Sequence, residues 1–146
     1  GPDSGVAPGR ILTDGTCIGA VSEFPMTVFR DGTRRLRHVQ LTAISWRELE
    51  ALLWQALESG QQAFVVLSHG SELLTRSRGR PDAVVLQRFL RLCDFLHRHA
   101  DCFATRTFDE GKPHFTERQP EPLRSSTWAT GLRIAEQLLR RRQERA

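Results

Sequence analysis

The sequence is poor in lysine and cysteine, contains no tyrosine and has no long apolar run. Lys112 is the single lysine, and the three cysteines are Cys17, Cys93 and Cys102. An odd number of cysteines without framework spacing argues against a disulfide scaffold and favours a reducing compartment such as the cytoplasm. Because no apolar run approaches the roughly 20 residues that a membrane helix needs, we expect no membrane span.

What is present describes one soluble globular domain. The chain has 146 residues, of which 39% are hydrophobic and 26% are charged. Its net charge of +4 comes almost wholly from arginine, and the densest cluster is Arg140 to Arg142. No aromatic residues alternate with these arginines to stack on bases, and cations suit a helix C-terminus. The pattern favours a solvated helix end over a nucleic-acid surface.

The first half of the chain predicts two extended segments and then a helix. Apolar residues alternate over 23–29, and 35–44 is a second extended segment that leads into the helix. Ser45 and Glu48 have the spacing of a capping box, and Gly60 is a stop signal. The predicted inner face of this helix consists of Trp46, Leu49, Leu52, Leu53, Ala56 and Leu57.

The second half continues the alternation of strands and helices. The uniformly apolar run in 62–69 is typical of a strand buried in a parallel sheet. A helix over 83–99 and a strand over 101–108 follow, and 127–146 forms a last amphipathic helix. The predicted apolar face of the 83–99 helix consists of Leu86, Phe89, Leu90, Cys93 and Leu96. This order of elements predicts an α/β fold whose crossovers build a parallel, barrel-like sheet.

His69 is the first candidate site residue, because it follows the apolar run 64–67. Loops at the C-terminal ends of parallel strands meet at one rim, and function concentrates there. An imidazole in such a place can act as a general acid or base. The alternative is a hydrogen-bonded histidine in a tight turn before Gly70.

The segment FVVLSHGSELL, together with the helix before it and the helix and strand after it, resembles the C-terminal half of the polysaccharide deacetylases of carbohydrate esterase family four. In that family a strand ends in Leu-x-His, which matches Leu67, Ser68 and His69. The resemblance implies that Leu67 lines the pocket for the acetyl methyl group. It also implies that His69 protonates the departing amine when N-acetyl groups of an amino-sugar polymer are hydrolysed.

The family's metal site has no counterpart in this sequence. The resemblance implies a divalent metal such as zinc in the complete domain, held by an Asp-Asp pair and a His-x-x-x-His motif. Neither pattern occurs in the 146 residues, and the family's Arg-x-x-Pro-Tyr segment is also absent. We therefore expect no metal ligands and no cofactor in this chain, and no deacetylase turnover by the chain alone. A bacterial cell envelope remains a second possible location.

Residues 1–19 are interpreted as a loop or ragged chain end, 20–108 as the later βα units of a deacetylase-like domain, 109–126 as a linker and 127–146 as the C-terminal helix. An incomplete barrel leaves sheet edges unpaired, so we expect either a homo-oligomer or a missing N-terminal half. No membrane partner is expected.

Three other functions can be drawn from the same residues. The first is a zinc site made of Cys93, His97, His99 and Cys102, although His99 points away from the other helical ligands. The second is a serine hydrolase using Ser68 or Ser71, but the chain has no G-x-S-x-G elbow. The third is a non-enzymatic, arginine-rich binding module for an anionic polymer or nucleic acid, whose binding would weaken with salt.

Overall fold

The computed structural model describes residues 11–75, 79–107 and 118–145. Its described residues form a mixed α/β fold with three α-helices and two small sheets. The α/β prediction is confirmed, but neither sheet is closed or curled into a barrel. The reason is that the strands are two or three residues long and belong to two separate sheets.

The sheets are built from short strands on both sides of the first helix in sequence. Strands β1 (Thr16–Ile18) and β2 (Val21–Glu23) form an antiparallel hairpin. The second sheet has the order β4-β3-β5, with β3 at Val28–Arg30, β4 at Leu36–His38 and β5 at Leu123–Arg124. Strand β4 runs antiparallel to β3, whereas β5 runs parallel to it.

The helices begin at side chains that cap their free backbone N–H groups. Helix α1 spans Trp46–Glu58, and the Ser45–Glu48 capping box predicted from the sequence is present. Helix α2 spans Ala83–Arg98, and the Asp82 carboxylate accepts hydrogen bonds from the first turn. Helix α3 spans Thr127–Arg145. A short 3₁₀ helix, η1, covers Gly70–Leu73.

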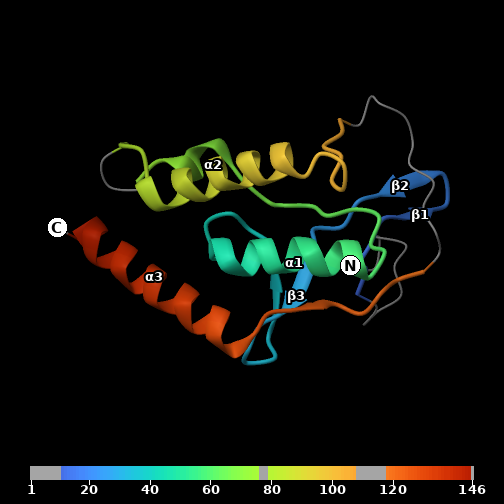
Figure 1. The fold of residues 1–146 in the computed structure, drawn as a ribbon, viewed down its shortest axis with the longest axis horizontal. Helices are drawn as coiled ribbons and strands as arrows, with labels where there is room; N and C mark the ends of the chain where they lie inside the picture. The colour runs from blue at the N-terminus through green and yellow to red at the C-terminus, as the bar shows by residue number, and fades with distance from the viewer. Residues whose placement is uncertain (1–10, 76–78, 108–117, 146) are drawn as a thin grey trace.

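Helix α1 is central to the fold. In Figure 1 it lies between α2 and α3, with β3 behind it, and it contacts α2, α3 and β5. The core forms around its inner face, and Phe29 of β3 and Phe95 of α2 are both almost fully buried against it. Among the described helices, none combines the length and apolar character needed to cross a bilayer.

Three predicted strands differ from the structure. The segment 23–29 is interrupted, because residues 24–27 lie outside the strands Val21–Glu23 and Val28–Arg30. Residues 101–107 form a turn and then irregular chain, because the N–H groups of Cys102 and Phe103 both donate to the His99 carbonyl. Residue 108 lies outside the described residues. Residues 63–67 are half-buried and make a parallel bridge only at Leu67, opposite Gln40. The predicted strand is therefore absent: only one isolated parallel bridge forms, and the segment is not completely buried.

Candidate functional site

The extended segment that leads to His69 is held by hydrogen bonds along its length. The Asp14 carboxylate accepts from the N–H groups of Gln62 and Ala63, at 2.7 and 2.8 Å. Val65 exchanges hydrogen bonds with Thr27, at 3.2 and 2.7 Å. Leu67 donates to the Val39 carbonyl at 2.9 Å and accepts from Leu41 at 3.0 Å. The end of the segment is therefore fixed on the rest of the fold.

His69 lies in an exposed turn that follows this segment directly. Its backbone is still extended, with φ −116° and ψ 142°. The Glu72 carboxylate accepts from the His69 N–H at 3.3 Å and from Gln40 Nε2 at 2.7 Å. These two bonds join the turn to the chain beside β4, so the position of His69 is well defined while its side chain faces solvent.

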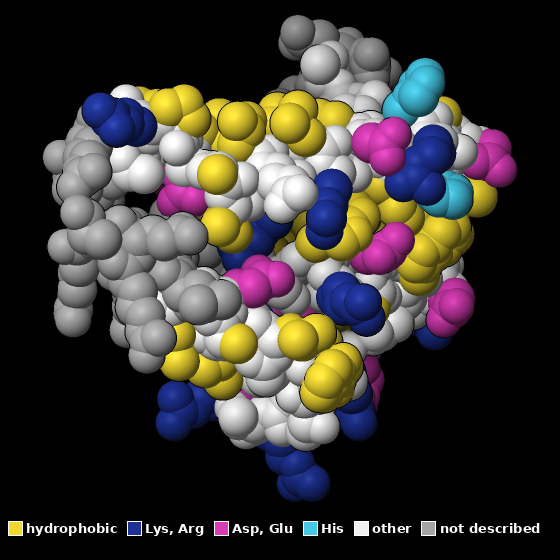
Figure 2. Space-filling view, turned by 60° about the vertical axis from the view of Figure 1, so that its left-hand side comes forward, with side chains coloured by type: hydrophobic (Ala, Val, Ile, Leu, Met, Phe, Trp, Pro, Cys, Tyr) yellow, Lys and Arg dark blue, Asp and Glu magenta, His cyan; other side chains and the backbone are white. Residues whose placement is uncertain are grey.

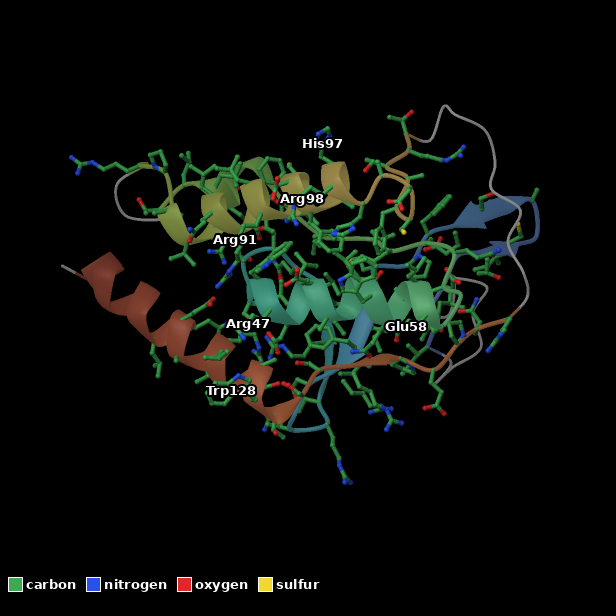
Figure 3. The ribbon with its side chains drawn as sticks, in the orientation of Figure 1. Arg47, Glu58, Arg91, His97, Arg98 and Trp128 are labelled. Atoms are coloured by element: carbon green, nitrogen blue, oxygen red, sulfur yellow. The ribbon has the colours of Figure 1, made fainter. Side chains whose placement is uncertain are left out.

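The residues of the alternative zinc site do not come together. Cys93 and Cys102 are exposed free thiols, and His97 points away from the body of the molecule (Figure 3). Desolvation and the neighbouring Asp101 carboxylate raise the pKa of the Cys102 thiol, which disfavours the thiolate that binds metal. Among the described residues, no group of three or more histidine, cysteine, aspartate or glutamate side chains could hold a metal ion.

His99 instead belongs to an aromatic cluster. Its ring lies 4.9 Å from that of Trp54 and 4.6 Å from that of Phe95, centroid to centroid. Phe103 packs against the same two rings at 5.5 and 5.4 Å. Edge-to-face contacts, as Trp54 makes with His99 and Phe103, and tilted contacts, as Phe95 makes with both, stabilise a core. They explain why the predicted strand after α2 turns back onto the helix.

A buried ionic cluster was not predicted from the sequence. Arg133 of α3 contacts Asp31 through Nη2 and Glu48 through Nε, both at 3.1 Å, and all three side chains are at most 4% exposed. Ser125 also donates to Glu48, at 2.9 Å. The sequence offered three separate signals, namely a turn aspartate, a capping glutamate and a helix arginine, but no pattern that pairs them.

Two opposing effects act on the pKa of Asp31. Burial raises it, while hydrogen bonds from Thr33 and Arg35 and the charge of Arg133 lower it. The Thr33 hydroxyl and N–H donate to Asp31 Oδ1 at 2.6 and 2.9 Å, and the Arg35 N–H donates at 3.2 Å. The lowering effects prevail, so the pKa of Asp31 lies below its ordinary value.

Comparisons with protein-family models, curated proteins and solved structures find no match. A functional assignment therefore depends on the residues described above.

Proposed function

We propose that the chain is the C-terminal portion of a metal-dependent polysaccharide deacetylase that hydrolyses N-acetyl groups of amino-sugar polymers. The observation that supports it best is the position of His69. Its imidazole is exposed, and its turn is held by the hydrogen bond from Gln40 to Glu72. The turn follows a segment in which Leu67 forms a parallel bridge with Gln40. In this proposal residues 20–108 belong to a deacetylase-like domain, although their described strands form small sheets and not a barrel.

His69 acts in this proposal as the general acid. Its imidazolium N–H donates a proton to the amine nitrogen as the bond between that nitrogen and the acyl carbon breaks, which leaves a neutral imidazole. Leu67, two residues before His69, contacts the acetyl methyl group. The hydrogen bonds along the segment hold the backbone of Leu67 and His69 in place. The exposed turn leaves room for a polymer.

The described residues do not fit the metal that the resemblance implies, because they contain no suitable group of ligands. The proposal therefore places the metal ligands elsewhere in the complete protein, and no step assigned to this chain depends on them.

The test uses the complete natural gene product. Acetate release from an N-acetylated oligosaccharide is measured for the wild type, for His69→Ala and for His97→Ala. A general acid contributes about 10²- to 10⁴-fold, so His69→Ala should lower kcat by that factor with little change in KM. His97, an exposed histidine of α2, is the matched control, and its replacement should leave kcat and KM unchanged.

Two results would contradict the proposal. One is a complete protein that releases no acetate in the presence of divalent metals. The other is equal activity of the His69→Ala and His97→Ala variants. Stoichiometric metal binding and acetate release by the 146-residue chain alone would instead contradict the placement of the metal ligands outside it.

One observation favours the second function, an arginine-rich module that binds an anionic polymer. The hairpin of β3 and β4 carries exposed Arg30, Arg34 and Arg35, while its aspartate, Asp31, is buried. Lys and Arg side chains project at the lower end of the molecule in Figure 2, where Figure 1 shows this turn. Elsewhere on the face in Figure 2 they are interspersed with acidic and apolar side chains.

The two functions separate by salt and by mutation. Binding of heparin or a DNA fragment through this hairpin should weaken steeply as salt rises. It should also weaken in an Arg34→Gln, Arg35→Gln double variant, while His69→Ala leaves it unchanged. Binding that is unaffected by the double variant would rule out the hairpin as the contact surface.

A further inference from the structure

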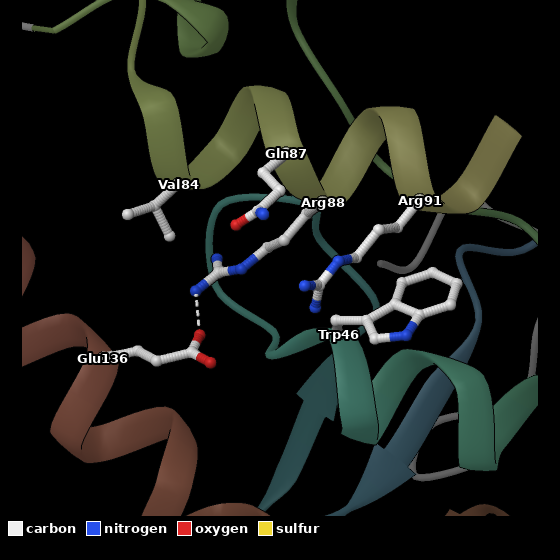
Figure 4. Close-up of a pocket in the computed structure, with 6 residues that line it drawn as sticks. All are labelled: Trp46, Val84, Gln87, Arg88, Arg91 and Glu136. Atoms are coloured by element: carbon white, nitrogen blue, oxygen red, sulfur yellow. Dashed lines mark hydrogen bonds and ion pairs between the residues drawn. The ribbon is translucent and has the colours of Figure 1, made fainter. Parts of the chain in front are cut away.

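A hollow of about 170 Å³ lies between the start of α1 and the facing sides of α2 and α3. Figure 4 shows the side chains that line it, which are Trp46, Val84, Gln87, Arg88, Arg91 and Glu136. It is separate from the turn that carries His69, and the proposed deacetylase chemistry does not use it. Two arginines and one glutamate give its lining a net charge of +1.

Arg88 is the buried cation of this hollow, with a side chain only 5% exposed. Its Nη1 donates to the carbonyls of Leu41 and Thr42 at 3.2 and 3.3 Å, and its Nη2 donates to Glu136 at 2.6 Å. Its Nε is buried and has no hydrogen-bond partner in the described part of the chain. A buried donor without an acceptor is costly, so the Nε edge of Arg88 lacks an acceptor that it should have.

Arg91 supplies a second cation from the next turn of α2. It is exposed, and no ion pair or hydrogen bond joins it to another described residue. In Figures 3 and 4 its side chain extends from α2 toward α1, beside the ring of Trp46. Two guanidinium groups thus face a space with a single carboxylate, which the half-exposed Glu136 brings from α3.

The remaining walls favour a ligand with an apolar body. The indole of Trp46 and the side chain of Val84 are apolar, and Gln87 adds a neutral polar group. An engineered protein cavity of about 150 Å³ holds a benzene molecule, so this hollow has room for a single small ring. Guanidinium groups bind carboxylates through two parallel N–H···O bonds, and the Nε and Nη2 edge of Arg88 can form such a pair when Glu136 leaves Nη2.

We propose that this hollow binds a small aromatic or branched monocarboxylate. The ligand carboxylate takes the place of Glu136 on Nη2 of Arg88, adds the missing bond to Nε and pairs with Arg91. Its apolar body rests on Trp46. Glu136, whose side chain is 43% exposed, turns toward solvent and so acts as an internal competitor.

The experiment titrates the 146-residue chain with benzoate and follows the indole N–H signals by NMR. The chain has three tryptophans, so a Trp46→Phe variant assigns the signal of interest and Trp128, 71% exposed, is the internal reference. We expect a saturable shift of the Trp46 signal and no saturable shift of the Trp128 signal. Benzamide, which has the same ring without the charge, should leave both signals unchanged.

Three variants test the charges. Arg91→Gln should weaken benzoate binding about tenfold, which is about 1.4 kcal/mol. Glu136→Gln should strengthen it, because the internal competitor loses its charge. Arg98→Gln is the matched control and should have no effect, since Arg98 lies on the same helix, pairs with Asp94 at the surface and does not line the hollow. Because Arg91 is exposed, its variant should fold even if variants of Arg88 do not.

Several outcomes would overturn the proposal. They are the absence of a saturable Trp46 shift, an equal response to benzamide, and equal affinities of the Arg91→Gln and Arg98→Gln variants. Inorganic phosphate that binds more tightly than benzoate would also overturn it, since the hollow would then be a phosphate site.

Discussion

At the scale of single residues, the fold depends on charges that are buried and paired. Arg133 uses two nitrogens of its guanidinium group, Nη2 for Asp31 and Nε for Glu48, so one cation pairs with a carboxylate from a turn and with another from α1. A lysine offers a single point charge and cannot present two donor nitrogens in one fixed plane. Such a cluster is costly to assemble, but removal of one member is costlier because it leaves the others unpaired.

Replacement of Arg133 by methionine should therefore lower the free energy of unfolding by about 3 to 5 kcal/mol. The variant keeps a side chain of comparable length but leaves Asp31 and Glu48 buried without a cation. Arg124→Met is the matched control, because Arg124 and Glu121 pair at the surface with side chains 72% and 84% exposed. That change should cost less than about 1 kcal/mol. Urea unfolding measures both, and equal effects would mean that the buried cluster adds nothing.

The lowered pKa of Asp31 makes stability depend on pH in a defined direction. Because the pKa is lower in the folded chain than in the unfolded one, the stabilisation is fully present above the unfolded value of about 4. It is lost as pH falls through the folded value. Urea unfolding of the wild type and of Asp31→Asn between neutral pH and strongly acidic pH measures this loss.

Asp31→Asn should be less stable than the wild type at neutral pH and should lose less stability on acidification. Asp94→Asn, which removes an exposed carboxylate of α2, is the control and should follow the wild-type curve. If the free energies of unfolding of the wild type and of Asp31→Asn change equally with pH, the acid-sensitive part of the stability does not come from Asp31.

At the scale of elements, the sequence predicted the helices better than the faces that they bury. The capping box of α1 is confirmed, and Leu49, Leu52, Leu53 and Ala56 of its predicted inner face are buried, whereas Leu57 is exposed. Helix α2 is present, but its buried residues lie roughly a third of a turn from the predicted stripe. They are Val85, Arg88, Leu92 and Phe95, whereas Phe89, Leu90 and Cys93 are exposed. A hydrophobicity pattern misses this face because it counts Arg88 as a polar position. The aliphatic stem of Arg88 nevertheless packs inward, while its guanidinium binds carbonyls.

Short strands were the least predictable elements. Strand β5 has two residues and lies in the segment interpreted as a linker, where a Pro-rich sequence carries no period that could predict it. Its position is determined by nonlocal contacts, namely pairing with β3 and two hydrogen bonds between Arg124 and Gln55. Sequence periodicity reports local preferences, and it therefore does not predict pairing between residues about a hundred positions apart.

Two glycines, one packed against the start of α3 and one inside α3, test how α3 packs on the fold. A Cβ atom at Gly32 would lie 2.5 Å from the Cα of Thr127, so Gly32→Ala should push the first turn of α3 away and cost about 1 to 3 kcal/mol. Gly131, inside α3, has nothing within 4 Å of the same position. Gly131→Ala should stabilise the chain by about 0.5 to 1 kcal/mol, because alanine favours the helix. Thermal unfolding should move in opposite directions for the two, and a shared direction would contradict this packing.

At the scale of the whole molecule, the candidate site was only partly predictable. His69 was singled out by its position after an apolar run and Leu67 by the family resemblance, and the structure places His69 in an exposed turn. The hollow between Arg88 and Arg91 could not be predicted, because its lining comes from three helices and includes Glu136 from the far end of the chain. The orientation of α3 brings these residues together, and no local sequence signal specifies that orientation.

The C-terminal segment is thus part of the same folded unit as the residues around α1. Gln119 accepts hydrogen bonds from the N–H groups of Thr13 and Asp14, at 2.8 and 3.1 Å, and Ser125 donates to Glu48. Strand β5 completes the second sheet, and α3 brings the cation for Asp31 and Glu48. Removal of the segment would leave two carboxylates buried without a cation and one edge of β3 without its neighbour.

We therefore expect that a chain ending at residue 117 does not unfold cooperatively, whereas a chain ending at residue 138 does. The shorter chain loses every contact named in the preceding paragraph. The longer chain keeps them all, because Arg133 is the last residue that makes one of these contacts. Near-ultraviolet circular dichroism and urea unfolding of the two chains measure the difference. A sharp unfolding transition of the 117-residue chain, with the midpoint of the full chain, would show that α3 and β5 are accessory to a core that folds without them.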